Sequence, residues 1–341
     1  MSNYDKKLVI AGNILVDVVK NIDSYPQIGM LSHITDISMA VGGCVPNTAI
    51  NLAKIDKNIP ITALGLVGDD ANGKFVVSQL AQNGINTDKI TYSKTIPTGF
   101  SDVMSLEGGE RTFFFNKGTN AAFGPEDIDV DNLDCDLFHI GYILLLDKFD
   151  ADDAEYGTAM ARLLKKVQEK GIKTSIDVVS DNNADYGKKI VPALKYANYA
   201  IINEIECCRI SKLDAYDADG KLNRENIKTA MLNMAKAGVK DKIIIHCKET
   251  AFAYDVKTQV YTEVPSLKIP SEMIKGSVGA GDTFCAGSLY AIYHGLSDEQ
   301  TLKFASAAAA CNLFAANSVD GIKSQEEILN MAENWERLKL I

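Results

Sequence analysis

The nine residues 276–284, GSVGAGDTF, combine glycines and one carboxylate in a spacing that suits chemistry on a phosphate group. Glycine lets an anion approach the main chain closely, and the first N–H groups of a helix carry the positive end of its dipole. The next residues, TFCAGSLYAIYH, predict a helix that ends before Gly295. The backbone N–H groups of Gly279, Ala280 and Gly281 are therefore expected to face a common anion. A turn that serves only close packing would have a similar sequence.

Asp282 follows this glycine turn directly, and the local sequence leaves two interpretations of it. As an N-cap, its side chain would accept hydrogen bonds from free N–H groups at the helix start. As a general base, it would accept the proton of a hydroxyl group that attacks the bound phosphate. The second interpretation predicts phosphoryl transfer to an alcohol.

Another stretch, GDDANGKF (68–75), fits the GxxxxGK core of a P-loop. Phe75 stands where a P-loop needs Ser or Thr for magnesium, and Asp69 and Asp70 would direct carboxylates into a phosphate cradle. These residues favour a strand end, an Asp N-cap and Gly73 in the first turn of a helix.

Composition narrows the class of protein. The net charge of −10 over 341 residues argues against binding to nucleic acid or to an anionic membrane surface. No run of about 18 apolar residues predicts a membrane span. The start of the chain, without a signal-peptide core, and seven scattered cysteines without a CxxC pair predict a cytoplasmic protein with reduced thiols. The four histidines form no HExxH-type pair, which argues against a structural transition metal.

Strand-like and helical segments alternate along most of the chain. Examples are the apolar runs at 6–12 and 61–68, helical periods at 71–84 and 186–197, and helices that start near 282, 298 and 324. This alternation predicts an α/β fold, a doubly wound, mostly parallel sheet with helices on both faces.

Three stretches break the alternation, at 15–23, 31–40 and 98–118, and predict antiparallel strands with a turn at Gly108 and Gly109. We expect a single domain over 1–341 with a small β-sheet lid formed from about 14–40 and 96–118. The alternative is an edge extension of the main sheet.

The motifs together resemble those of the PfkB-type (ribokinase-like) carbohydrate kinases. GSVGAGDTFCAG is similar to the C-terminal signature of that family and VGGCVPNTAINLAKI (41–55) to its N-terminal signature. GLVGDDANGKF resembles the strand–turn–helix between them, and INEIE (202–206) resembles the Asn-x-x-Glu motif. The motifs occur in the family's order and cover nearly the whole chain, and the resemblance implies a doubly wound domain with a β lid.

The resemblance also implies roles for individual residues. Asp282 matches the catalytic base, and the anion hole is matched by Gly279, Ala280 and Gly281. Asn203 and Glu206 match the motif that organises Mg²⁺ and the ATP phosphates, largely through water, and a carboxylate and an amide suit such a hydrated ion. The positions that hold substrate hydroxyl groups are matched by Asp17, Gly42, Gly43 and Asn47.

Some residues depart from the family pattern. His246, Cys247 and Lys248 replace a Thr-x-Gly turn, and Lys248, if not simply solvated, would supply positive charge near the phosphates. Gly276 and Ser277 replace Asp-Thr at the start of the glycine loop. We expect Ser277 on the nucleotide side, and the loss of that Asp means that the resemblance does not support a monovalent-cation site here. Of an Asp-Pro-Asn motif, only Asp177 is present.

The leading hypothesis is an ATP-dependent kinase that phosphorylates a hydroxymethyl group of a sugar or sugar derivative. One alternative is a nucleoside kinase of the same fold, in which Tyr142 and the three phenylalanines 113–115 would stack on a base rather than pack in the core and lid. Another is a non-catalytic, sugar-binding regulatory protein. The sequence leaves the acceptor open, and an exposed apolar lid face would favour a homodimer.

Overall fold

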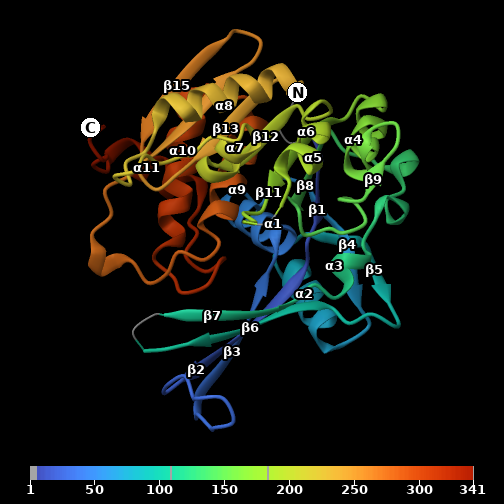
Figure 1. The fold of residues 1–341 in the computed structure, drawn as a ribbon, viewed down its shortest axis with the longest axis vertical. Coiled ribbons are helices and arrows are strands. Elements are labelled where there is room, and N and C mark those ends of the chain that lie inside the picture. Colours follow the sequence, from blue (N-terminus) through green and yellow to red (C-terminus); the bar gives the residue numbers. More distant parts are fainter. Residues whose placement is uncertain (1–5, 108–109, 183, 341) are drawn as a thin grey trace.

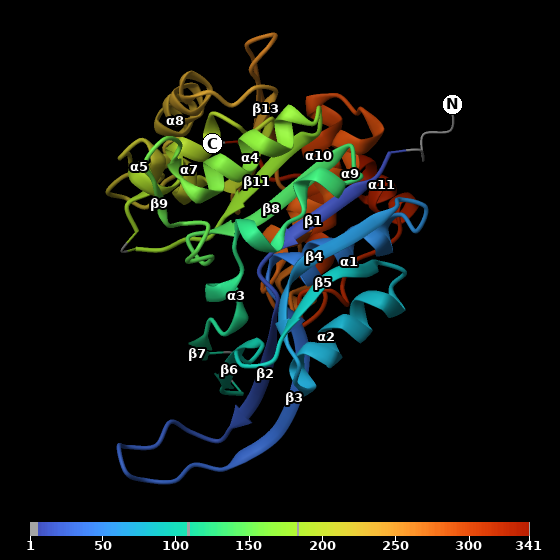
Figure 2. The same ribbon diagram turned by 90° about the vertical axis from the view of Figure 1, so that its right-hand side faces the viewer.

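The main body is built on one nine-stranded sheet with helices on both faces (Figures 1 and 2). The structure, a computed structural model, describes residues 6–107, 110–182 and 184–340, so the predicted turn at 108–109 lies outside the described residues. From one edge to the other the strands are β15 (Val260–Pro265), β14 (Thr250–Asp255), β13 (Lys242–His246), β12 (Tyr199–Asn203), β11 (Lys173–Val178), β8 (Leu137–Ile143), β1 (Leu8–Gly12), β4 (Ile61–Gly68) and β5 (Asn86–Ser93).

Neighbouring strands from β5 to β13 pair in parallel, which confirms the predicted mostly parallel sheet. The hairpin β14–β15 adds two antiparallel strands at one edge. No pattern in the sequence predicted this hairpin.

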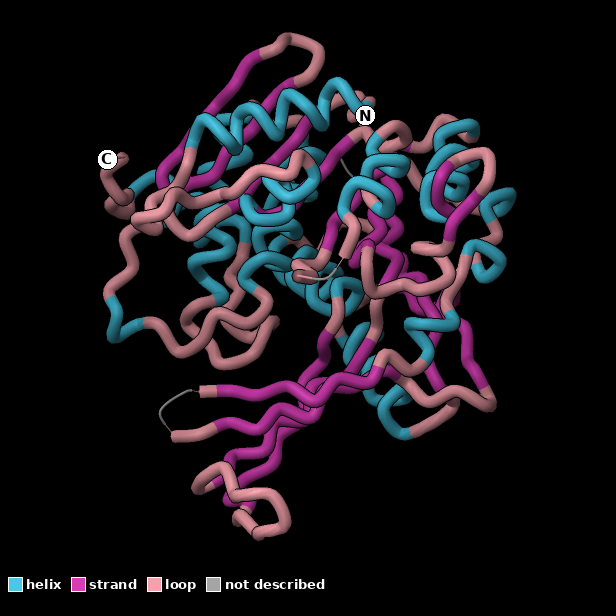
Figure 3. The backbone as a smooth tube through the Cα atoms, viewed as in Figure 1, coloured by secondary structure: helices cyan, strands magenta, loops and turns pink. Residues whose placement is uncertain are grey.

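Helices cover both faces of this sheet, as predicted (Figure 3). One face packs against α1 (Cys44–Ile55), α2 (Ala71–Gln82), α9 (Ala280–His294), α10 (Asp298–Asn312) and α11 (Gln325–Asn334). The other packs against α4 (Ala159–Glu169), α5 (Tyr186–Lys189), α6 (Val191–Leu194), α7 (Glu204–Ile210) and α8 (Arg224–Ala237). The central strand β1 shows why both faces need cover, since Leu8 and Ile10 belong to one apolar core and Val9 to the other.

The remaining elements are short: α3 (Thr119–Ala122), the two-stranded pair β9 (Asp152–Asp153) and β10 (Gly157–Thr158), and 3₁₀ turns at Pro125–Asp127, Val130–Asn132 and Ser271–Met273. None of the helices in the described ranges combines the length and apolarity needed to cross a bilayer.

Two helical predictions can be compared directly with the structure. Asp70 caps α2 by accepting a hydrogen bond from the N–H of Gly73 at 2.8 Å, which confirms the cap and excludes the P-loop. The single helix predicted over 186–197 is wrong, because α5 and α6 are separate single turns that meet at Ile190. Pro192 at the start of α6 has no N–H to continue a helical ladder from the preceding turn.

The strands outside the alternation form a separate four-stranded sheet that stands off the main body (Figure 1). Its order is β3 (Ile34–Gly42), β2 (Leu15–Ile22), β6 (Gly99–Ser105), β7 (Arg111–Asn116), so the edge-extension alternative is wrong. The predicted antiparallel pairing holds for β2–β3 and β6–β7, but β2 and β6 run parallel. A parallel pair needs a long connection, and here β3, α1, β4, α2 and β5 lie between the two strands.

The order of the strands also places the site. The chain adds strands to both sides of β1, with β4 on one side and β8 on the other, so the strand order reverses there. In sheets of this kind, ligands bind outside the carboxyl ends of the strands at the point of reversal. Tyr142, Asp177, Asn203 and His246 all lie at or near the carboxyl end of their strands. These side chains therefore face one edge of the sheet, where α9 begins.

Candidate active site

The glycine turn before α9 has the geometry that its sequence predicts. Gly279 is the N-cap of the helix, with φ of 77° in the left-handed region, and a Cβ atom there would lie 2.3 Å from Cβ of Ser318. Only glycine fits both conditions. Because Gly279 is the cap, Asp282 is the third residue of the helix, and its interpretation as an N-cap is wrong.

Asp282 is instead held by two donors from distant segments. Its Oδ2 accepts a hydrogen bond from Nδ2 of Asn47 at 2.8 Å, and its Oδ1 accepts one from the hydroxyl of Tyr142 at 2.6 Å. The side chain is 4% exposed, and burial raises the pKa of the carboxyl group to about 6, although both hydrogen bonds favour the charged form. The carboxylate is therefore mostly ionised at neutral pH and is a stronger base than an exposed Asp.

Asn47 reaches Asp282 because its own amide is fixed. Its side-chain oxygen accepts a hydrogen bond from Oγ of Ser318 at 2.7 Å, which turns the NH₂ group toward the carboxylate. The next turn of α1 repeats the link, since Asn51 donates to Oγ1 of Thr283 at 2.9 Å. Asn47 was predicted to hold a substrate hydroxyl group. In the structure its fixed amide instead donates to the carboxylate of Asp282 and positions it.

Asp17 lies on the other side of the glycine turn, on β2. It lines a pocket of about 30 Å³ with Arg111, Val278 and Ser318 among its other walls. Burial raises the pKa of Asp17 to about 6, and the charge of Asp282 adds to this rise, while a hydrogen bond with Ser101 opposes it. The two carboxylates therefore interact electrostatically, although Asp282 is not among the residues that line this pocket.

Two glycines of the N-terminal motif shape this region. A Cβ atom at Gly42 would lie 2.7 Å from Oδ2 of Asp17, so glycine leaves room for that carboxylate. Gly43 has φ of 87°, and its Cβ would lie 2.6 Å from the backbone oxygen of Asn13. Gly43 is thus explained by the turn into α1, and Gly42 by the approach of Asp17.

A larger pocket, of about 620 Å³, opens on the opposite side of the start of α9. Its wall contains three of the four residues predicted on the nucleotide side, Asn203, Lys248 and Ser277, together with Gly281 of the predicted anion hole, but not Glu206. Lys248 and Ser277 are exposed, and a Cβ atom at Gly281 would lie only 3.3 Å from the ring of His246. Ala280 also lines the pocket, but its N–H donates to the backbone oxygen of Ser277 at 3.2 Å, so the turn already uses this predicted anion-hole donor.

Asn203 and Glu206 form a capping box at the start of α7. Oδ1 of Asn203 accepts from the N–H of Glu206 at 2.8 Å, and Oε2 of Glu206 accepts from the N–H of Asn203 at 3.0 Å. Oε1 of Glu206 also accepts from Ser180 and from the Asn203 amide, both at 2.8 Å. Burial raises the pKa of Glu206 to about 7.

This arrangement fits a hydrated magnesium ion. Both carboxylate oxygens of Glu206 already accept hydrogen bonds, so contact with an ion through water requires less rearrangement than direct ligation. Negative charge is unfavourable here, because burial and the neighbouring charges of Glu206 and Asp282 hold the pKa of Asp177 well above its usual range and favour its protonated form. A cation between these groups and the large pocket would offset that charge.

Sequence reasoning missed the link between Tyr142 and Asp282 and the role of Ser318. Tyr142 is 140 residues from Asp282 along the chain, and its only sequence signal was an aromatic ring at the end of an apolar strand. Ser318 lies in a loop without a motif.

Comparison with known proteins shows the family of the chain. Residues 5–324 match the protein family described as pfkB family carbohydrate kinase. The chain is 24% identical to the ribokinase of Arabidopsis thaliana over 327 residues, which cover 95% of this chain and 80% of that protein. It is 25% identical to the 5-dehydro-2-deoxygluconokinase of Listeria innocua over 310 residues, covering 87% and 88%.

Two solved structures share the fold. Arabidopsis thaliana ribokinase complexed with ribose and ATP superposes with a TM-score of 0.78 at 21% identity, covering 96% of this chain and 99% of that one. A putative ribokinase II from E. coli in complex with ATP and Mg²⁺ gives a TM-score of 0.72 at 18% identity, covering 95% and 98%.

The chain belongs to the pfkB family of carbohydrate kinases. The predicted family, fold and enzyme class are confirmed, and the alternative of a non-catalytic regulatory protein is wrong.

Proposed function

We propose that this protein transfers the γ-phosphoryl group of ATP to a hydroxymethyl group of a sugar or sugar derivative, with Asp282 as the general base. The observation that carries the proposal is the position of the glycine turn between two pockets. Val278 and Ser318 line the pocket of Asp17, while Ser277, Ala280 and Gly281 line the larger one. A hydroxyl group on one side and a terminal phosphate on the other would meet at the start of α9, beside Asp282.

The residues divide the chemistry between them. Asp17 accepts hydrogen bonds from the acceptor's hydroxyl groups, and Asp282 takes the proton of the attacking one. The N-terminus of α9 stabilises negative charge on the transferred group, and Lys248 adds positive charge at the mouth of the larger pocket. Asn203 and Glu206 would hold Mg²⁺ through water, and the bound ion would neutralise charge on the phosphates.

The relatives support the two substrates. One solved relative carries ribose and ATP, and another carries ATP and Mg²⁺. A nucleoside acceptor draws less support, because the Tyr142 hydroxyl is engaged by Asp282 and because the phenylalanines of β7 are 42–58% exposed, with Phe113 alone among them lining the pocket of Asp17.

We propose that the four-stranded sheet is a lid and a dimer surface. The exposed apolar side chains on β3 and β7 are Ile34, Ile37, Met39, Phe113, Phe114 and Phe115. Alternation along β7 puts Phe114 on one face of the sheet and Phe113 and Phe115 on the other, and apolar area left in water on either face favours a second copy of the chain. Light scattering should find a dimer that Phe114→Asp converts to a monomer, and a monomeric wild-type protein would contradict the dimer.

Replacement of Asp282 by Asn tests the proposed base. The variant keeps the shape of the side chain but cannot accept the proton, so kcat should fall by about 10²–10⁴ while ATP still binds. Asp88→Asn, at an exposed position of β5, is the matched control and should leave kcat unchanged. Full activity of Asp282→Asn would refute the mechanism. A coupled assay with sugars, sugar acids and nucleosides would then identify the acceptor.

A further inference from the structure

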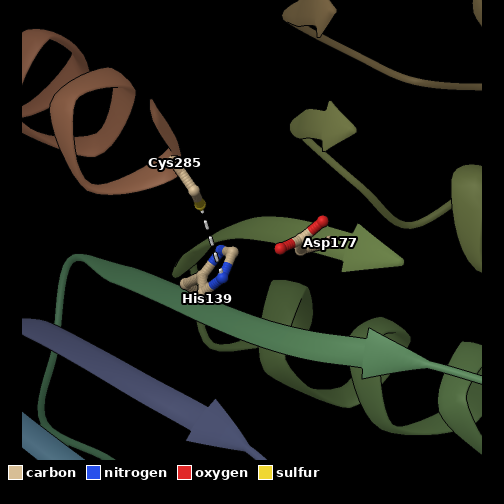
Figure 4. Close-up of side chains that lie close together, drawn as sticks. All are labelled: His139, Asp177 and Cys285. Atoms are coloured by element: carbon tan, nitrogen blue, oxygen red, sulfur yellow. Dashed lines mark hydrogen bonds between the residues drawn. The ribbon is translucent and has the colours of Figure 1, made fainter. Parts of the chain in front are cut away.

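A second group of polar side chains lies one helical turn beyond Asp282, where the proposed reaction does not use it. It consists of His139 on β8, Asp177 on β11 and Cys285 on α9, here called the His139 cluster (Figure 4). One possible ligand atom from each residue lies within 4.8 Å of the other two. The three side chains are 1%, 6% and 1% exposed.

The three side chains form a ligand set for a particular kind of ion. An imidazole nitrogen, a thiolate and a carboxylate suit Zn²⁺ and similar borderline cations, and three protein ligands leave one coordination position open. The hard Mg²⁺ ion prefers oxygen ligands and keeps several waters. The histidines are far apart in sequence, so the spacing used to judge metal motifs could not reveal a cluster drawn from three separate elements.

The orientation of His139 is also that of a metal ligand. Its Nδ1 lies 3.1 Å from Oγ of Ser175, which fixes the ring and leaves Nε2 directed at Sγ of Cys285, 3.7 Å away (Figure 4). Ligating histidines are commonly held by a second hydrogen bond of this type. Burial lowers the pKa of His139 to about 3, so the ring is neutral, as ligation requires.

Asp177 gives an independent electrostatic reason for a cation. One of its oxygens accepts a hydrogen bond from the N–H of Val178 at 2.7 Å, and its carboxyl group is buried beside the negative charges of Glu206 and Asp282. A divalent cation at the His139 cluster would offset the negative charge of all three carboxylates.

We propose that the His139 cluster binds one Zn²⁺-class ion per chain and that the bound ion inhibits phosphoryl transfer. On binding, the thiol of Cys285 and any protonated carboxyl of Asp177 release their protons to solvent, and metal–sulfur, metal–oxygen and metal–nitrogen bonds form without a redox change. Cys285 and Asp282 are three residues apart on α9, on the same face of the helix. The cation stabilises ionised Asp282 and makes it a weaker base.

Metal binding can be measured separately from activity. Chelator-treated protein in excess Mg²⁺ and without ATP should take up one Zn²⁺ per chain, and Co²⁺ should produce a thiolate-to-metal absorption band. Cys285→Ser should lose both. Cys311→Ser, at a buried cysteine of α10 that contacts Met331, is the matched control and should retain both. Ser175→Ala keeps all three ligands and should weaken binding by about tenfold or more.

Inhibition is the second readout. Zn²⁺ should inhibit the wild-type enzyme, a chelator should reverse the inhibition, and Cys285→Ser should raise the half-inhibitory concentration at least about tenfold. Equal Zn²⁺ uptake by wild type and Cys285→Ser, or the absence of the cobalt band in wild type, would overturn the site. Unchanged inhibition in Cys285→Ser would overturn its inhibitory role and point to Zn²⁺ competing at the nucleotide. If Cys285→Ser fails to fold, Ser175→Ala decides, and wild-type affinity in that variant would overturn the proposal.

Discussion

Removal of the Tyr142 hydroxyl should change the pH dependence of the enzyme in a specific way. The hydroxyl donates to Oδ1 of Asp282 at 2.6 Å and favours the ionised carboxylate. A buried hydrogen bond to a charged group contributes roughly 1.5–3 kcal/mol. At about 1.4 kcal/mol for each unit, Tyr142→Phe should raise the pKa of Asp282 by about one to two units.

The rate profile should move with that pKa. Asp282 must be ionised to accept a proton, and its pKa is about 6 in the wild-type protein. The acid limb of kcat/KM should therefore move from about pH 6 to about pH 7–8 in the variant. At about pH 6 the variant should be roughly 5- to 50-fold slower, and at about pH 9 it should reach the wild-type rate, because both carboxylates are then ionised.

The assay is a coupled kinase measurement across pH with ATP saturating. Tyr290→Phe is the matched control, since its hydroxyl donates to Oε1 of Gln325 at 2.6 Å on the same helix, about 12 Å along the axis from Asp282. It should leave the acid limb in place. An unchanged limb in Tyr142→Phe would refute the assignment of that limb to Asp282, and a uniform loss of rate at every pH would show a structural effect instead.

Three further predictions concern the turn and the two pockets. Gly279→Ala should lower the free energy of unfolding by about 1–3 kcal/mol in chemical denaturation, because φ is 77° and Ser318 is in the way, whereas Gly171→Ala, at φ of 80° with open space, should cost less. Equal losses would contradict the packing argument. Asp17→Asn should raise KM for the acceptor about tenfold or more without changing KM for ATP, and acceptor binding by wild type should weaken as pH falls through about 6, where Asp17 becomes protonated. A change in KM for ATP alone would contradict the assignment of Asp17 to the acceptor. Lys248→Met should raise KM for ATP, rather than KM for the acceptor, in steady-state kinetics. The increase should be several-fold, which corresponds to about 1 kcal/mol of binding free energy. An unchanged KM for ATP would show that Lys248 is merely solvated.

The sequence predicted what local patterns determine. The glycine turn, the cap of α2 and the alternation of strands and helices depend on residues near one another, and each is found in the structure. The choice of strand partners does not depend on neighbours in this way. The parallel pairing of β2 with β6 and the addition of β14–β15 to the sheet edge arise from contacts across the fold, which short patterns do not encode.

The same limit applies to the candidate site. Asp282 could be identified because it stands within a motif, but its donors lie 235 and 140 residues away along the chain. Asn47 illustrates the consequence. Its motif marked it as a residue of interest, yet only the structure shows that Ser318 turns its amide toward Asp282. Asp177 likewise gains its meaning from the buried charges around it.

The proposed mechanism requires an acceptor hydroxyl and the terminal phosphate of ATP to meet at the start of α9 beside Asp282. A crystal structure with a non-hydrolysable ATP analogue, Mg²⁺ and the acceptor tests it most directly. The proposed mechanism predicts the acceptor against Asp17, its reacting hydroxyl about 2.6–3.2 Å from the Asp282 carboxylate, and the phosphates on the side of Ser277 and Gly281. Phosphates in the pocket of Asp17, or an acceptor hydroxyl out of reach of Asp282, would contradict it.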